Sequence, residues 1–163
     1  MTRSWSIKDL EHWDARIREK VQEFGLTCCS QEFEVCDHEQ MLGYMAYHGM
    51  PAHYPHWSYG KSYEKLKTLY DHGVSGLPYE MVINSNPCIA YLMEENSMMM
   101  QCLVMAHACF GHNSFFKSNY LFRTWTDAEA IIDYLVFARN YLAECEQRHG
   151  ELEVELLLDS CHA

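Results

Sequence analysis

Two histidines stand five residues apart at the end of the most apolar stretch of the chain, in the segment Met105 to Asn113. Burying imidazole rings beside apolar side chains costs free energy unless each ring finds a polar partner, and a metal ion is one such partner. On an unbroken α-helix, residues five apart differ by roughly 140° around the axis. If Gly111 ends the helix in a left-handed turn, however, His112 turns back toward His107. We therefore predict that His107 and His112 are ligands of zinc or another divalent metal.

Two histidines do not complete a metal site, because structural zinc needs four protein ligands and catalytic zinc usually three plus water. The segment before the apolar stretch supplies Glu80 and Glu95, which are the candidates for a catalytic base. It also supplies Asn84 and Asn86, which could hold an imidazole or a water molecule, and these two and Asn113 are predicted to line a pocket. The alternative, that both histidines are core residues bonded to backbone carbonyls or asparagine side chains, stays open.

A second group of histidine and aromatic side chains lies between Met50 and Gly60. Loops rich in such residues can line a pocket, and His53, His56 and Trp57 are the candidates here. Aromatic loops also cover cores, so a packing role for these three residues is the alternative.

The elements that must position these residues follow from the spacing of apolar side chains. Ser6 and the pair Asp37 and Gln40 resemble helix caps, as does the pair Thr126 and Glu129. The two short apolar runs around Ser85-Asn86-Pro87 favour an antiparallel hairpin, and Met50 to Gly60 is expected to be a loop. The expected helices span 7–24, 37–49, 63–73, 97–110, 126–150 and 151–159, and the expected strands span 79–84 and 88–93. This predicts an α+β fold that is predominantly helical, with a small hairpin preceding a buried helix.

Composition limits the classes of function. Twelve Lys and Arg against 23 Asp and Glu give a formal charge of −11, which repels nucleic-acid phosphates and anionic membranes. The start of the chain lacks the apolar core of a secretory signal, and no apolar stretch reaches the length of a membrane span, so a cytoplasmic location is expected. The eight cysteines contain no CxxC pair and are interpreted as buried thiols; metal ligation by Cys28, Cys29 and Cys36 is the less favoured alternative.

Three segments give a more specific indication, because Tyr54 to Glu64, Gly76 to Pro87 and Val104 to Lys117 resemble the SpoVR family, the stage V sporulation protein R-like proteins. The resemblance extends over essentially the whole chain, so residues 1–163 are expected to form a single SpoVR-like N-terminal region. Family members are considerably longer, which agrees with the apolar end of the chain at Leu156 to Ala163 and makes the C-terminal part of the same protein an expected partner.

The resemblance implies a link to spore cortex formation, or to starvation and stress responses beside a serine protein kinase. It also implies a likeness to thermolysin-like zinc peptidases, in which two helix histidines and a later glutamate bind zinc. Here Ala108 follows His107, in the place where those peptidases carry the glutamate that acts as general base. Two hypotheses result: a metal-dependent hydrolase, peptidase-like, with ligands His107 and His112, and a non-catalytic regulatory or scaffold protein that works with a serine protein kinase.

Overall fold

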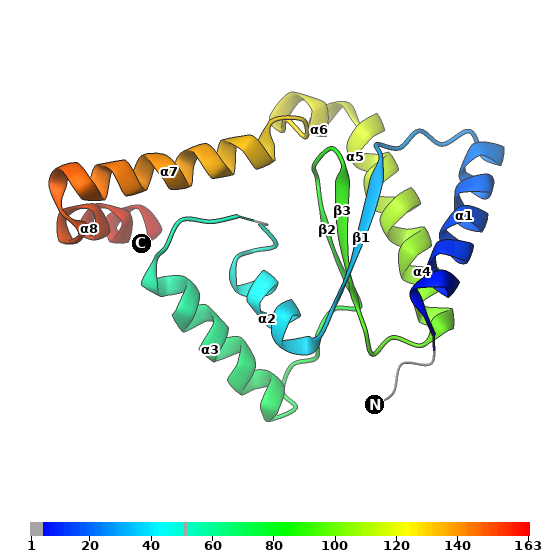
Figure 1. Cartoon of the computed structure of the whole chain (residues 1–163), viewed down its shortest axis with the longest axis horizontal. Helices are drawn as coiled ribbons and strands as arrows, with labels where there is room; N and C mark the ends of the chain where they lie inside the picture. The colour runs from blue at the N-terminus through cyan, green and yellow to red at the C-terminus, as the bar shows by residue number, and fades with distance from the viewer. Residues whose placement is uncertain (1–4, 51) are drawn as a thin grey trace.

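The computed structural model describes residues 5–50 and 52–163 as helices arranged about one small sheet (Figure 1). In chain order, the elements are α1 (Ile7–Glu23), β1 (Gln31–Cys36), α2 (His38–Ala46), α3 (Trp57–Asp71), β2 (Glu80–Ile83), β3 (Cys88–Met93), α4 (Met98–Ala106), the π-helix η1 (His107–Asn113), α5 (Ser114–Ser118), α6 (Tyr120–Trp125), α7 (Ile131–His149) and α8 (Glu151–His162). The fold is α+β and predominantly helical, as predicted.

The sheet has three strands in the order β1-β3-β2, so β3 is the central strand. The predicted hairpin is confirmed: β2 pairs antiparallel with β3, and Glu80 lies opposite Leu92. The strand β1 was not predicted; it pairs parallel with β3 from Gln31 opposite Cys88 to Cys36 opposite Met93. Alternating Glu32 and Glu34 gave β1 the appearance of a polar segment, although alternation is itself a strand signal.

Helices cover both faces of this sheet (Figure 1). On one face, Leu92 of β3 packs with Leu10 of α1 and with Val104 and Met105 of α4. On the other face, Tyr91 and Met93 of β3 pack in a cluster with three further buried side chains, Cys36, Met41 and Ile83. Because successive side chains of a strand point to opposite faces, β3 contributes to both cores and anchors the neighbouring elements.

Two predicted helix starts are confirmed in detail. Ser6 accepts a hydrogen bond from the Asp9 backbone N–H and Asp9 bonds back to Ser6, which forms a capping box for α1. Asp37 and Gln40 form the same arrangement at α2. These reciprocal bonds satisfy backbone N–H groups that a helix start leaves without a partner.

Three predicted boundaries were wrong. The segment expected to be a loop up to Gly60 already turns into α3 at Trp57, because the His56 side chain accepts a hydrogen bond from the Ser58 N–H and caps the helix. The helix expected to begin at Thr126 begins at Ile131 as α7. Asp127, and not Thr126, accepts hydrogen bonds from the backbone N–H groups of Glu129 and Ala130 just before it. The last helix, α8, extends to His162 rather than ending near 159. Pro51, expected to break the second helix, lies outside the described residues.

The apolar helix was expected to be buried over most of its surface, and this is true of only one face. Val104 and Met105 are buried, whereas Met99 is 84% exposed and Leu103 is 63% exposed.

The helix α7 also exposes apolar side chains. It projects away from the sheet and is paired with α8, which is folded back along it (Figure 1). None of the described residues of α7 is buried, and its apolar side chains Tyr134, Val136, Phe137 and Tyr141 are exposed.

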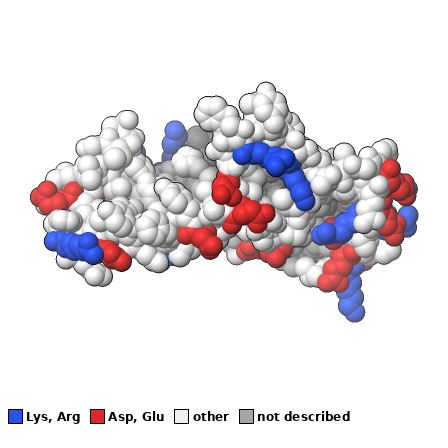
Figure 2. Space-filling model, turned by 90° about the horizontal axis from the view of Figure 1, so that it is seen from above, with Lys and Arg blue, Asp and Glu red and all other residues white. Residues whose placement is uncertain are grey.

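Charged side chains are interspersed among uncharged ones on the face shown in Figure 2. Among the described residues, no helix combines the length and the apolar composition that crossing a bilayer requires.

Candidate metal centre

The segment that carries the two histidines is a π-helix. Residues His107–Asn113 follow α4 without a break and continue into α5. The predicted left-handed turn at Gly111 is wrong, because the chain remains helical through this glycine and widens instead. The hydrogen bonds of a π-helix join residues five apart, so such residues lie above one another rather than on different faces. Short π-helical segments occur frequently at functional sites.

This widening brings the two imidazoles together. The rings of His107 and His112 are stacked, with centroids 4.6 Å apart and planes inclined by 9°. The predicted proximity of the two histidines is therefore present, although its cause is the π-helix and not a turn. His107 has 58% of its side chain exposed, so the expectation of two buried imidazoles is wrong for this residue. His112 is half-buried.

Glu80 supplies a third candidate ligand from the first residue of β2. Its Oε1 lies 3.4 Å from His107 Nδ1, and its side chain is only 11% exposed. One ligand atom each from Glu80, His107 and His112 lie within 4.8 Å of one another. The other carboxylate oxygen, Glu80 Oε2, is buried and has no hydrogen-bond partner. A buried carboxylate oxygen without a partner is costly, and a metal ion bound between these three residues would satisfy it.

The electrostatic environment of His112 favours its neutral form, which is the form that binds a metal. Burial lowers the pKa of His112, and the neighbouring His107 lowers it further. Burial raises the pKa of Glu80, and the charge of His107 opposes this rise. A metal ligand must be a neutral imidazole or an ionised carboxylate. His112 is thus already biased to the neutral form, and a cation beside Glu80 would stabilise its ionised form.

Gly111 is necessary for the position of the His107 ring. A Cβ atom at this residue would lie 2.9 Å from Cδ2 of His107, closer than side chains normally approach. The glycine thus provides space for the imidazole. The sequence showed this glycine, but its function was misread as helix termination.

Asn113 ends the π-helix and fastens it to the start of β1. Its Oδ1 accepts a hydrogen bond from the Cys29 N–H at 2.8 Å, and its Nδ2 donates to the Cys29 carbonyl and to Gln31 Oε1, both at 3.0 Å. The residue is 1% exposed. Asn113 therefore acts on the site through the position of the helix and is not aimed at the histidine pair.

The other predicted residues of the hairpin region lie elsewhere. Glu95 is beside His38, with 3.8 Å between Oε1 and Nδ1. Asn84 donates to Thr126 Oγ1, and Asn86 donates to Glu129 Oε1. The structure brings Glu80 to the histidines and does not bring the other three there.

The second predicted cluster is held together by contacts to the last helix. His56 Nε2 lies 3.2 Å from Asp159 Oδ1, and the Trp57 indole N–H donates to the same oxygen at 2.6 Å. His53 Nε2 is 3.0 Å from the Tyr59 hydroxyl. His56 and Trp57 also lie at a cavity of about 510 Å³ beside α7 and α8. His56 and Trp57 thus contact α8, whereas His53 packs among tyrosines, and none of the three belongs to the Glu80, His107 and His112 cluster.

All eight cysteines are free thiols. The alternative of a cysteine metal site receives no support in the described part of the chain, where the group of potential ligands that comes together is Glu80, His107 and His112. The interpretation as buried thiols is correct for Cys36, Cys88 and Cys109. It is wrong for the exposed Cys161, and the remaining four cysteines, Cys28, Cys29, Cys102 and Cys145, are half-buried.

The fold and the geometry define a mixed α+β protein with a two-histidine, one-carboxylate cluster on a π-helix and a sheet edge. The chain belongs to the SpoVR-like family, because the family described as SpoVR like protein matches residues 4–163. It is 57% identical over 159 residues to a protein of Escherichia coli (strain K12) called "Uncharacterized protein YcgB". That alignment covers 98% of the chain and 31% of the relative, so the chain spans about a third of the relative's length. No solved structure matches the chain significantly.

Proposed function

We propose that Glu80, His107 and His112 bind one divalent transition-metal ion, with zinc as the first candidate, and that this centre hydrolyses amide bonds. The observation that carries the proposal is the convergence of one ligand atom each from Glu80, His107 and His112 within 4.8 Å, together with the buried Glu80 Oε2 that lacks a hydrogen-bond partner. Two histidines and one carboxylate are a common ligand set of catalytic zinc, which keeps the remaining position for water.

The half-exposed His107 supports a catalytic centre over a structural one. Structural zinc sites are closed by four protein ligands, whereas this cluster offers three and is reachable from solvent at His107. Zinc would lower the pKa of its water to about 7 and so supply hydroxide near neutral pH. Hydrolysis of an amide would consume one water molecule: its hydroxyl bonds to the carbonyl carbon, the C–N bond breaks, and the other proton of the same water goes to the departing amine.

This assignment gives Glu80 the function of a ligand. Glu95, the other candidate base, lies at His38. Because Glu80 is used as a ligand, a zinc ion held by Glu80, His107 and His112 would activate the attacking water without a separate carboxylate base. The position after His107 is Ala108, in agreement with such a mechanism.

Zinc titration by calorimetry tests the metal site. We expect one zinc ion per chain, a loss of affinity of at least about tenfold in Glu80→Gln and His112→Ala, and no change in the control His12→Ala, an exposed histidine of α1. Equal zinc binding by all four proteins would refute the site. Hydrolysis of a fluorogenic peptide by the zinc-loaded chain, lost in His112→Ala, tests the catalytic part separately.

A second candidate function is a non-catalytic regulatory or scaffold role beside a serine protein kinase, in sporulation or stress responses. The exposed apolar side chains of α7, among them Phe137 and Tyr141, support it, because exposed apolar patches commonly mark interaction sites. Phe137→Glu combined with Tyr141→Glu should abolish co-purification of a kinase or of the rest of a longer SpoVR-like protein. Unchanged co-purification would contradict an interaction through this face.

A further inference from the structure

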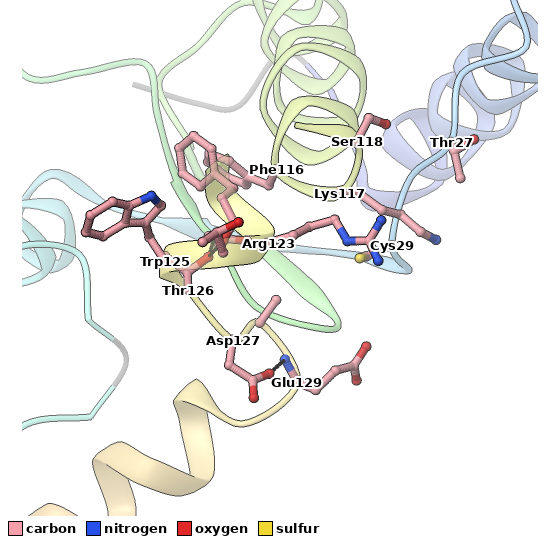
Figure 3. Close-up of a pocket in the computed structure, with 14 residues that line it drawn as sticks. Thr27, Cys29, Phe116, Lys117, Ser118, Arg123, Trp125, Thr126, Asp127 and Glu129 are labelled. Atoms are coloured by element: carbon pink, nitrogen blue, oxygen red, sulfur yellow. Dashed lines mark hydrogen bonds between the residues drawn. The ribbon is translucent and has the colours of Figure 1, made fainter. Parts of the chain in front are cut away.

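A pocket of about 950 Å³ lies next to the candidate metal centre, between α5, α6 and the segment that leads into α7 (Figure 3). Its size is typical of small-molecule sites. Phe116 connects the two features, because the centroid of its ring lies 5.9 Å from that of His112 and the same residue lines the pocket.

The pocket carries opposite charges in separate places. Figure 3 shows Lys117 and Arg123 together near Cys29, and Asp127 and Glu129 at the other end. Among the described residues, none of these four side chains forms an ion pair. Both ends of the pocket thus retain a charge that a ligand could neutralise.

The polar contacts of these four groups leave the charges available. Lys117 Nζ donates to the Cys28 carbonyl at 2.7 Å, which fixes the ammonium without neutralising it. Asp127 Oδ1 accepts from the Glu129 backbone N–H at 3.1 Å. The carboxylate of Glu129 accepts from the neutral amide of Asn86. Arg123 is exposed and presents a planar guanidinium, which suits bidentate binding of a carboxylate.

Aromatic side chains form the apolar part of the pocket. Phe116 and Phe122 contact each other with centroids 5.0 Å apart, and Trp125 is 78% exposed. A ligand with one anionic end, one cationic end and apolar side chains would match all parts of this lining. A short peptide with free termini has this chemistry, whereas the acidic end disfavours a phosphate dianion.

We propose that this pocket binds short zwitterionic peptides, with the terminal carboxylate at Arg123 and Lys117 and the ammonium group at Asp127 and Glu129. The proposal rests on the proposed hydrolase function and names its substrate class. Arg123 becomes a specificity-determining residue that selects a free carboxylate, and Phe116 links peptide binding to the metal ligand His112.

The test measures binding of alanyl-alanyl-phenylalanine to the zinc-free 163-residue chain by calorimetry, so that it does not depend on the metal site. Amidation of the peptide carboxylate and the variant Arg123→Gln are each expected to weaken binding about tenfold, because each removes one charge-assisted interaction. Acetylation of the peptide amine and Asp127→Asn are expected to weaken binding as well. Arg148→Gln, which changes an exposed arginine of α7, is the control and should bind as the unchanged chain does.

The outcomes separate this proposal from the metal centre. Equal binding of free and amidated peptides, equal binding by Arg123→Gln and Arg148→Gln, or no peptide binding at all would each overturn it. If zinc binds as proposed and the peptides do not, only the substrate assignment fails. If the peptides bind with the expected pattern and zinc does not, the pocket stands and the hydrolase function fails.

Discussion

The imidazole rings of His107 and His112 lie nearly parallel, 4.6 Å apart, because a π-helix replaces the α-helix between them. In an α-helix these residues would face directions roughly 140° apart. The local change of helix type therefore creates the pair, and Gly111, between the two histidines, removes the Cβ that would collide with the first ring.

Replacing this glycine should weaken metal binding without unfolding the chain. In Gly111→Ala the new Cβ would lie 2.9 Å from His107 Cδ2, so the ring must move away from its position over His112. We expect zinc affinity to fall by about tenfold to a hundredfold, the range for groups that orient metal ligands. Calorimetry gives the affinity, and circular dichroism confirms the helix content. Gly43→Ala in α2 is the matched control, since nothing lies within 4 Å of its added Cβ; a similar loss there would contradict the explanation.

Replacing Glu80 should have opposite effects on stability and on metal binding. The pKa of Glu80 is raised in the folded chain by burial, so the folded protein holds this proton more tightly than the unfolded chain does. Its ionised form therefore destabilises the fold above both pKa values, and this destabilisation disappears as the pH falls through the folded-state pKa. Glu80→Gln should increase the free energy of unfolding of the zinc-free chain at neutral pH, on the order of 1 kcal/mol.

Urea unfolding measures that change, and the same variant should lose zinc binding. Glu95→Gln, at the partly exposed residue beside His38, should change stability by no more than about 0.5 kcal/mol. A destabilised Glu80→Gln would show that the carboxylate already has a favourable partner in the metal-free chain.

The pH dependence of zinc binding should reflect the lowered pKa of His112. Burial lowers this pKa from the ordinary value of 6.5, so proton competition at His112 begins at lower pH than for an exposed histidine. Because the pKa of His112 is lower in the folded chain than in the unfolded chain, folding favours the neutral ring. The stability that follows from this is present above the unfolded-state pKa and is lost as the pH falls toward the folded-state pKa. NMR titration of the His112 ring should give a midpoint below 6.5, the ordinary histidine value. A midpoint above this value would contradict the effect of burial.

Replacing Asn113 should mainly lower the free energy of unfolding, because this residue holds the π-helix in place and does not contact the histidine pair. Its hydrogen bond to Gln31 is buried and its two to Cys29 are partly buried, and each contributes about 0.5 to 1.5 kcal/mol. Asn113→Ala is therefore expected to cost about 2 to 4 kcal/mol of unfolding free energy, measured in urea. Asn84→Ala, which removes one exposed bond to Thr126, should cost less than about 1 kcal/mol. Equal costs for the two variants would exclude the proposed anchoring.

The sequence predicted those parts of the fold that depend on local chemistry. The helix cap at Ser6, the capping box at Asp37 and the hairpin of β2 and β3 form from neighbours in the chain, and all three are confirmed. The strand β1 was missed although its side chains alternate, and its parallel partner β3 could not be inferred from neighbouring residues because it lies more than fifty residues later.

The candidate site, like the fold, was predicted only where local sequence determines it. The histidine pair and Glu80 were predicted from residue type. Their proximity depends on a π-helix, which spacing rules for α-helices do not predict. Glu95, Asn84 and Asn86 were predicted on the same grounds, but their side chains contact His38, Thr126 and Glu129 respectively. The resemblance to the SpoVR family was confirmed, since it depends on order and identity of residues and not on geometry.

The parallel pairing of β1 with β3 also determines the order in which the chain can fold. Gln31 pairs with Cys88, so α2, α3 and β2 lie in the chain between β1 and its partner strand. Among the described strands, the hairpin of β2 and β3 joins near neighbours in the sequence, whereas the pairing of β1 with β3 must first close a long loop, which is the costlier entropic step. We therefore expect the addition of β1, and with it the attachment of the π-helix through Asn113, to follow the formation of the hairpin.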